Sequence, residues 1–181
     1  MFGKPVSLFS VFGFEIKVDM SWLILAALIT WSLASGLFPE YYKDLPKSAY
    51  WWMGIAGAIG LFLSIIVHEL THSIVARHYG VSMKEITLFI FGGVAHMEED
   101  PSSPKAEFMI AVVGPVSSFL LAASAFLLYK VGVYSGWPVT LTGVLNYLSW
   151  LNMILAVFNL IPAFPLDGGR ILRSALWKWK K

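Results

Sequence analysis

The chain has 181 residues, of which 57% are hydrophobic and 13% are charged, and its mean hydropathy is +0.70. A soluble domain with a mostly polar surface is excluded by this composition, which predicts a polytopic membrane protein. The formal net charge of +2 is too small to indicate nucleic-acid binding. Cysteine is absent, which excludes disulfides and thiolate metal sites and leaves His and carboxylate side chains as metal ligands.

The N-terminal segment, residues 1–19, predicts a β-hairpin at the membrane surface. Apolar and charged side chains alternate from Glu15 to Asp19 at the two-residue period of a strand, and Gly13 is a candidate turn residue. The same charges interrupt the apolar run, so the segment is not expected to be a signal peptide.

Four apolar stretches have the length, about 20 residues, that crosses the hydrocarbon layer as a helix. They are Ser21–Leu37, Trp51–Val75, Phe108–Leu128 and Val139–Ile161. The predicted fold class is therefore an all-α polytopic membrane protein with about four transmembrane helices and short membrane-associated β-strands.

A β-rich segment, Glu85–Phe91, follows the second stretch and ends at Gly92 and Gly93. It is too short to cross a membrane as a helix and too apolar for an ordinary loop. We expect a strand that dips into protein-lined space, because irregular backbone at membrane depth needs protein or water to satisfy its polar groups.

Lysine and arginine are distributed unevenly between the two sides. Four spans put both termini on one side, and that side holds Lys4, Lys17, Arg77, Lys84, Lys105, Arg170, Arg173, Lys178, Lys180 and Lys181. The opposite loops hold only Lys43, Lys47 and Lys130. Since cytoplasmic loops carry the excess of positive charge, we predict a multi-pass cell-membrane protein with both termini in the cytoplasm.

The second span contains the sequence His68-Glu69-Leu70-Thr71-His72. Two histidines four residues apart project from one helix face and can bind the same metal ion. Glu69 is then placed to take a proton from a water molecule on the metal and pass it to a departing amine. The alternative is a metal-free His/Glu cluster, but ionisable groups at the bilayer centre cost about 3 kcal/mol and are usually functional, which favours a metal site.

A catalytic zinc needs a third protein ligand, and Asp167 is the candidate. It follows the fourth span in a segment where Pro162 and Pro165 end the helix and Gly168-Gly169 permits a sharp turn back toward the metal. An ordinary helix cap is the alternative role for Asp167. Weaker candidates for the third ligand are His96, Glu98, Glu99 and Asp100.

The chain resembles the site-2 proteases, which are intramembrane zinc metalloproteases that carry out regulated intramembrane proteolysis. The matching features are His68-Glu69-Leu70-Thr71-His72, Phe91-Gly92-Gly93, Gly114-Pro115, and the series Asn159, Pro162, Pro165 and Asp167. Together they cover Trp51 to Arg173 in the family's order, which is far more specific than any one of them alone.

The resemblance implies one Zn²⁺ ion and substrates that are transmembrane proteins, cut within or near their membrane-spanning segments. It implies that His68, His72 and Asp167 are the metal ligands and Glu69 the catalytic acid/base. It further implies that Asn159 helps to hold the substrate.

An extended substrate is expected to pair with the strand from Ile86 to Phe91 by edge addition, because a protease must reach the backbone carbonyl. We accordingly predict Phe91, Gly92 and Gly93 as substrate-binding residues. We predict a single domain, 1–181, with a hairpin at 1–19, a catalytic core at 51–173, and an interfacial tail or a continuation cut short at 174–181.

Two other functions use a similar site, a metal or proton transporter and a catalytically silent membrane scaffold. A transporter needs a polar pathway, and the first and third spans offer almost no polar groups. A site that only binds has no need of Glu69 beside its ligands. The expected partners are transmembrane protein substrates and the lipid bilayer, no nucleic acid is expected, and a regulatory partner or a homo-oligomer is compatible with the sequence.

Overall fold

The computed structural model describes residues 5–89, 92–97 and 100–179. Within these ranges it has four helical segments that are long and apolar enough to cross a membrane. They are Met20–Tyr41, Lys47–His78, Pro104–Tyr134 and Val139–Asn159. The four spans and the mostly helical fold class predicted from the sequence are confirmed.

The first span is a composite of α1 (Met20–Ser32), a π-helical segment η1 (Leu33–Leu37) and α2 (Phe38–Tyr41). The Asp19 carboxylate caps α1 by accepting a hydrogen bond of 2.9 Å from the backbone N–H of Ser21. Helix winding changes just before Pro39, whose ring cannot donate to the ladder and crowds the preceding turn.

The next two spans are longer than their apolar stretches predicted. Helix α3 (Lys47–His78) has 32 residues and α4 (Pro104–Tyr134) has 31. At a rise of 1.5 Å per residue, each is about 47 Å long and exceeds the hydrocarbon layer of about 30 Å. Helix α5 (Val139–Asn159) has 21 residues.

Local capping explains where α4 begins and where α3 ends. Ser103 caps the N-terminus of α4, since its side chain accepts a 3.2 Å hydrogen bond from the Ala106 N–H. Helix α3 is followed by Gly80 at φ +76°, and the Val81 N–H donates back to the Ala76 carbonyl at 2.9 Å. This is a Schellman ending, which depends on the left-handed conformation that glycine adopts freely.

A four-stranded sheet has the strand order β1-β2-β3-β4. Its strands are β1 (Val6–Val11), β2 (Phe14–Val18), β3 (Met83–Phe89) and β4 (Gly92–Met97). The predicted hairpin is present: β1 and β2 pair antiparallel around a two-residue turn that contains Gly13 at φ +84°. Strand β3 then pairs parallel with β2 and antiparallel with β4.

The position of β3 corrects one prediction about substrate binding. Ile86 pairs with Ile16 on one side and with Ala95 on the other, so β3 is an interior strand and has no free edge. The sequence does not reveal that a hairpin about 70 residues earlier occupies this edge. Strand β4 is the sheet edge on this side, and it includes Gly92 and Gly93.

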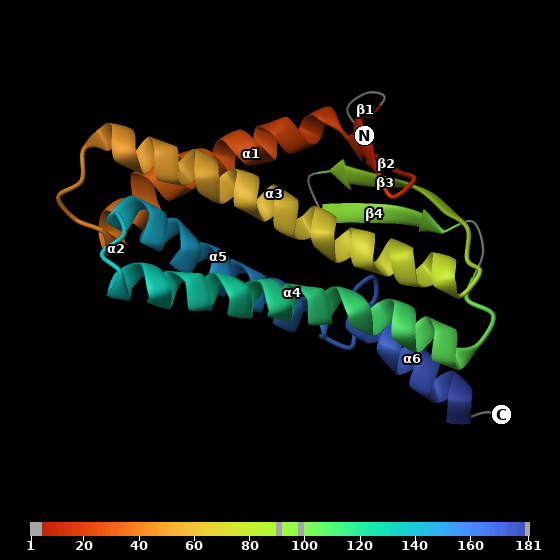
Figure 1. The fold of residues 1–181 in the computed structure, drawn as a ribbon. Helices are drawn as coiled ribbons and strands as arrows, with labels where there is room; N and C mark the ends of the chain where they lie inside the picture. The colour runs from red at the N-terminus through yellow and green to blue at the C-terminus, as the bar shows by residue number, and fades with distance from the viewer. Residues whose placement is uncertain (1–4, 90–91, 98–99, 180–181) are drawn as a thin grey trace.

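The sheet packs against α3 at the level of the motif histidines. One core cluster joins strand residues to two helices; its buried members are Phe14, Ile16, Val18, Ile66, Ala76, Val81, Ile86 and Ile110. Figure 1 shows the sheet, the C-terminal end of α3 and both chain termini at one end of the helical bundle. The cytoplasmic placement of both termini stays a prediction.

Close helix contacts hold the opposite half of the bundle. A Cβ added to Gly60 would lie 2.4 Å from a Leu148 methyl carbon, and one added to Gly54 would lie 2.7 Å from the Thr30 carbonyl oxygen. Small residues therefore allow α3 to approach α5 and α1 closely, as expected for packing in a membrane.

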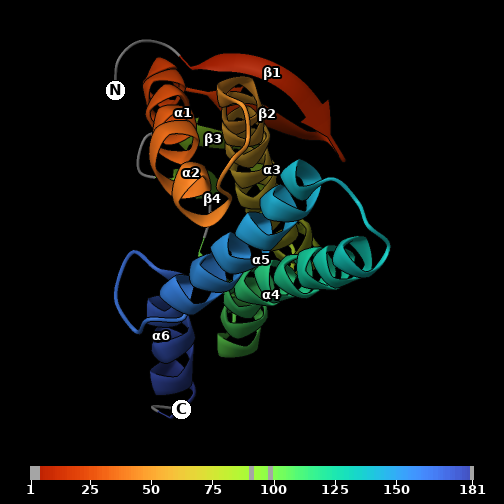
Figure 2. The ribbon, with the colours of Figure 1, turned by 90° about the vertical axis from the view of Figure 1, so that its left-hand side faces the viewer.

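A final helix, α6 (Asp167–Trp179), follows the irregular segment 160–166. It packs mainly on α4, and Figures 1 and 2 show it beside the N-terminal end of that helix. The described part of the predicted tail, residues 174–179, is the second half of α6.

Candidate metal centre

His68 and His72 project from one face of α3, as their four-residue spacing predicts. Both are buried, and their Nε2 atoms lie 3.1 Å apart. The helix therefore presents two imidazole nitrogens to one point inside the bundle.

The other ring nitrogen of each histidine is bonded to α4. Nδ1 of His72 lies 2.6 Å from the carbonyl oxygen of Ile110, and Nδ1 of His68 lies 2.9 Å from Oγ of Ser118. A carbonyl oxygen only accepts, so Nδ1 of His72 carries a proton, and Nε2 would be the atom that offers a lone pair to a metal. Outer partners of this kind commonly orient metal ligands.

Gly114 explains how α4 comes so close to the histidines. A Cβ at this position would lie 2.1 Å from Nε2 of His72 and 2.7 Å from Nε2 of His68. Any side chain here would occupy the space between the two ligand atoms. Gly114 therefore brings α4 directly against the histidine pair.

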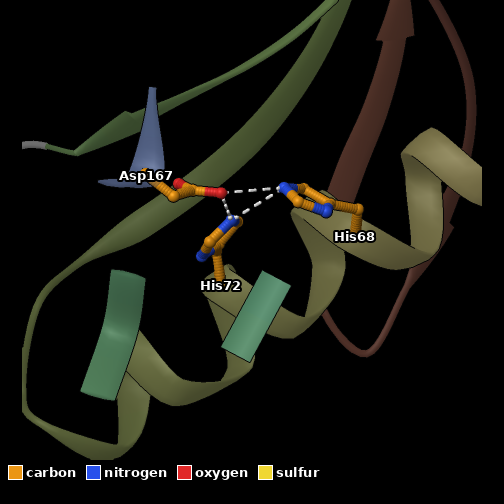
Figure 3. A group of neighbouring side chains, drawn as sticks. All are labelled: His68, His72 and Asp167. Carbon is orange, nitrogen blue, oxygen red and sulfur yellow. Dashed lines mark hydrogen bonds and ion pairs between the residues drawn. The ribbon is translucent and has the colours of Figure 1, made fainter. Parts of the chain in front are cut away.

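Asp167 reaches the same point from the far end of the chain. Its Oδ2 atom lies 3.1 Å from Nε2 of His68 and 3.2 Å from Nε2 of His72 (Figure 3). Asp167 is buried and is the first residue of α6. The predicted return of this segment toward the histidines is thus present.

The glycines after Asp167 are required by the segment that precedes it. A Cβ on Gly168 would lie 2.3 Å from the carbonyl oxygen of Leu160 and 2.4 Å from that of Ile161. A Cβ on Gly169 would lie 2.8 Å from the backbone of Ala163. The start of α6 therefore packs directly on the backbone after α5, which holds Asp167 against the bundle.

Electrostatics favour the ionised form of Asp167. Burial opposes ionisation, but the hydrogen bonds with His68 and His72 outweigh that cost and hold the pKa of the carboxyl below its usual range. The side chain is therefore a carboxylate at neutral pH and is ready to bind a cation.

The three side chains fit a zinc ion. Their candidate ligand atoms all lie within 4.8 Å of one another, and the three separations are 3.1, 3.1 and 3.2 Å. Tetrahedral zinc with bonds of about 2.0–2.1 Å has ligand atoms about 3.3–3.4 Å apart, so little movement is needed. Two nitrogens and one oxygen are also the donor types that catalytic zinc prefers.

Glu69 lies beside this group without belonging to it. It is half-buried, and it interacts electrostatically with His68, His72 and Asp167. A carboxylate next to the ligand set can exchange protons with a reacting group.

The remaining predicted residues are less closely tied to the three ligands. Asn159, at the end of α5, donates a 2.9 Å hydrogen bond to the Leu155 carbonyl. Gly92 and Gly93 pair through β4 with Phe89 and Leu88, while Phe91 is outside the described residues.

The weaker ligand candidates do not join the described metal group, which consists of His68, His72 and Asp167. Asp100 is exposed and lies 3.6 Å from the Arg173 guanidinium. Glu98 and Glu99 are outside the described residues, and the side chain of His96 is not described.

Ser118 and the Ile110 carbonyl are functional partners that were not predicted from the sequence. A main-chain oxygen leaves no trace in a sequence, because every residue has one. Ser118 did leave a signal, since it is one of three serines in the span Phe108–Leu128 and lies one helical turn after Gly114.

Residues 56–137 and 131–181 match the model of Peptidase family M50. The chain belongs to this family. The solved structure of a site-2 protease from Methanocaldococcus jannaschii superposes with a TM-score of 0.66 at 34% identity, covering 97% of this chain and 73% of that one. The resemblance to site-2 proteases is thereby confirmed.

Two sequence relatives agree with this family. Rip3 of Mycobacterium tuberculosis is 40% identical over 168 residues, which are 92% of this chain and 42% of Rip3. Zinc metalloprotease MJ0392 of Methanocaldococcus jannaschii is 36% identical over 178 residues, 96% of this chain and 46% of the relative. The chain thus spans less than half the length of these relatives.

Proposed function

We propose that this protein is a zinc-dependent endopeptidase that hydrolyses peptide bonds within or near the membrane-spanning segments of other proteins. The observation that carries the proposal is the buried group of His68, His72 and Asp167 with Glu69 beside it, inside a bundle of membrane-spanning helices. Membership of Peptidase family M50 supports the same reaction class.

His68 and His72 would hold one zinc ion through Nε2, and Asp167 through Oδ2. When bound, zinc supplies Lewis acidity toward water and toward the scissile carbonyl. Glu69 accepts a proton from water at its carboxylate and delivers it to the nitrogen of the departing amine. Peptide hydrolysis then needs no covalent enzyme intermediate.

An extended substrate would run along the edge of the sheet. Strand β4 is the edge strand that pairs with β3. Gly92 and Gly93, with Phe91 before them, would therefore offer backbone groups to a substrate strand. Asn159 would contact the substrate from the end of α5. Proline substitutions along Val94 to Met97 should then lower cleavage, and unchanged cleavage would remove this part of the proposal.

The charge distribution supports a cytoplasmic position for both termini, the sheet and α6. His68 and His72 lie in the half of α3 nearer that side. Water would therefore reach the site from the cytoplasm, and cleavage would release a cytoplasmic fragment, as in regulated intramembrane proteolysis.

The first test compares wild type with Glu69→Gln, using purified protein, a model single-span substrate and a measurement of bound zinc. Equal zinc content with cleavage only in wild type is the expected result, because the amide cannot accept the proton. Equal cleavage by both would reject the role of Glu69. Zinc without cleavage in either protein, with several single-span substrates, would favour a silent scaffold.

A further inference from the structure

An ion pair joins α4 to α6 about one helical turn before Ile110, whose carbonyl oxygen bonds His72. Glu107 of α4 is completely buried, and its Oε1 contacts both Nε and Nη2 of Arg173 on α6. Its other oxygen, Oε2, has no hydrogen-bond partner among the described residues. Arg173 therefore supplies the direct compensation for this buried charge.

Glu107 lies on the face of α4 that meets the metal site. On α4, the residues Glu107, Ile110, Gly114 and Ser118 follow one another by three or four positions and so share a face. The last three are the residues of α4 that bond or closely approach the two histidines. The helix that fixes the histidines is thus the one to which Arg173 is bound.

On α6, Arg173 is six residues after Asp167, about 1.7 helical turns. Helix α6 packs mainly on α4 and is joined to α5 through the irregular segment 160–166. Sliding or rotating α6 would separate Arg173 from Glu107 and would also move Arg170, which interacts electrostatically with the same carboxylate, so the buried charge would lose its compensation. The ion pair therefore restricts α6 to one position along α4.

We propose that Glu107 and Arg173 are positioning residues that set α6 so that the Asp167 carboxylate meets His68 and His72. The pair touches neither substrate nor reacting atoms, and it acts through the placement of the third ligand. This inference rests on the metal site of the proposed function, but it concerns residues outside that site.

Asp100 provides a matched control. Its carboxylate lies 3.6 Å from the same guanidinium, but its side chain is 87% exposed. Converting either acid to its amide removes one negative charge next to Arg173, so Asp100→Asn and Glu107→Gln differ in burial and not in chemistry. An exposed pair of this kind contributes little to stability.

The experiment measures zinc affinity by competition with a chromophoric chelator, and the visible absorption spectrum of the cobalt(II)-substituted protein. The variants are Glu107→Gln, Arg173→Gln, Arg173→Lys and Asp100→Asn, all in the full chain. Zinc affinity should fall about 10- to 100-fold in the first two, the range for outer partners of metal ligands, and their cobalt spectra should change. Lysine should recover part of the loss, and Asp100→Asn should match wild type.

The double variant Glu107→Gln/Arg173→Gln sharpens the result, because two residues that act through each other have non-additive effects. Its zinc affinity should be no lower than that of Arg173→Gln alone. Since Arg173 is partly exposed, its substitution keeps the test available if Glu107→Gln does not fold. Wild-type affinity and spectrum in either folded single variant would overturn this inference alone, whereas a wild type that binds no zinc would overturn the proposed function with it.

Discussion

The metal centre has two halves that are held in different ways. His68 and His72 belong to one uninterrupted helix and are bonded at their outer nitrogens to α4. Asp167 is 99 residues away from His68 and stands at the junction of an irregular segment and α6. The histidine half follows from local helix geometry, whereas the aspartate half depends on tertiary packing.

This difference indicates which kind of substitution should damage each half. The histidine half should be sensitive to steric intrusion, because α4 lies against the ligand atoms without a gap. The aspartate half should be sensitive to changes that move α6 as a body. Zinc affinity reports on both halves, and the cobalt spectrum reports on how many ligands remain.

The largest loss of zinc affinity is expected for Gly114→Ala, which disturbs the positions of the two histidines. Its methyl group would lie 2.1 Å from Nε2 of His72, so α4 or the imidazole must move. Zinc affinity should fall by more than about 100-fold, beyond the range for loss of one outer hydrogen bond. Gly36→Ala is the matched control, since nothing lies within 4 Å of the added carbon. Equal zinc binding by the two variants would contradict the close approach of α4 to the histidines.

The next effect is expected for Gly168→Ala, which moves the aspartate half while leaving the histidines in place. Its methyl group would collide with the carbonyl oxygens of Leu160 and Ile161, so the start of α6 must shift. Zinc affinity should fall toward the upper end of about 10- to 100-fold. Cobalt should still bind through the histidines with an altered spectrum, and an unaltered spectrum would show that Asp167 had kept its place.

A smaller effect is expected for Ser118→Ala, which removes the partner of His68 Nδ1 but adds no atom. The imidazole loses its orientation and not its ligand atom, so zinc affinity should fall about tenfold. Ser117→Ala is the neighbouring control, because the Ser117 hydroxyl bonds the Gly114 carbonyl and Thr71. A larger loss in Ser117→Ala than in Ser118→Ala would reject the assigned role of Ser118.

The smallest effect is expected for Lys17→Met, which lies outside both halves. Lys17 bonds Glu85 across the sheet and also pairs with Glu15 at 3.1 Å. Hydrogen bonds to Glu85 and Glu15 raise the pKa of Lys17 above its ordinary value. A raised pKa means that any stabilisation is present below the unfolded value of about 10.4 and is lost only above it. The difference in melting temperature between wild type and variant should therefore stay constant between pH 6 and pH 9. Zinc affinity should be unchanged.

The histidine half of the metal centre could be predicted almost completely from the sequence. The spacing of His68 and His72 determines a shared helix face, and the apolar context of the span makes their polarity conspicuous. Asp167 could be proposed because prolines and glycines mark a chain reversal after the fourth span. Its contact with both histidines could not be derived, since it depends on how α6 packs on α4.

In the sheet, local sequence patterns predicted strands but could not predict how the strands pair. Alternation and Gly13 predicted the hairpin, and β-rich composition predicted β3, because both are local signals. The parallel pairing of Lys17 with Thr87 joins segments 70 residues apart, and no local pattern specifies it. That pairing places β3 inside the sheet, which is why edge addition was assigned to the wrong strand. Likewise, hydropathy located α4 but missed its start, which Ser103 and Pro104 determine by capping.

The large sequence separation between His68 and Asp167 has a consequence for biogenesis. Synthesis proceeds from the N-terminus, so the histidine-bearing span enters the membrane long before the ribosome reaches Asp167. A nascent chain that ends before α6 carries two ligands and lacks the third. Under the proposed function, the protein should therefore stay inert toward neighbouring membrane proteins throughout its own insertion, and peptidase activity should begin only once Asp167 is in place.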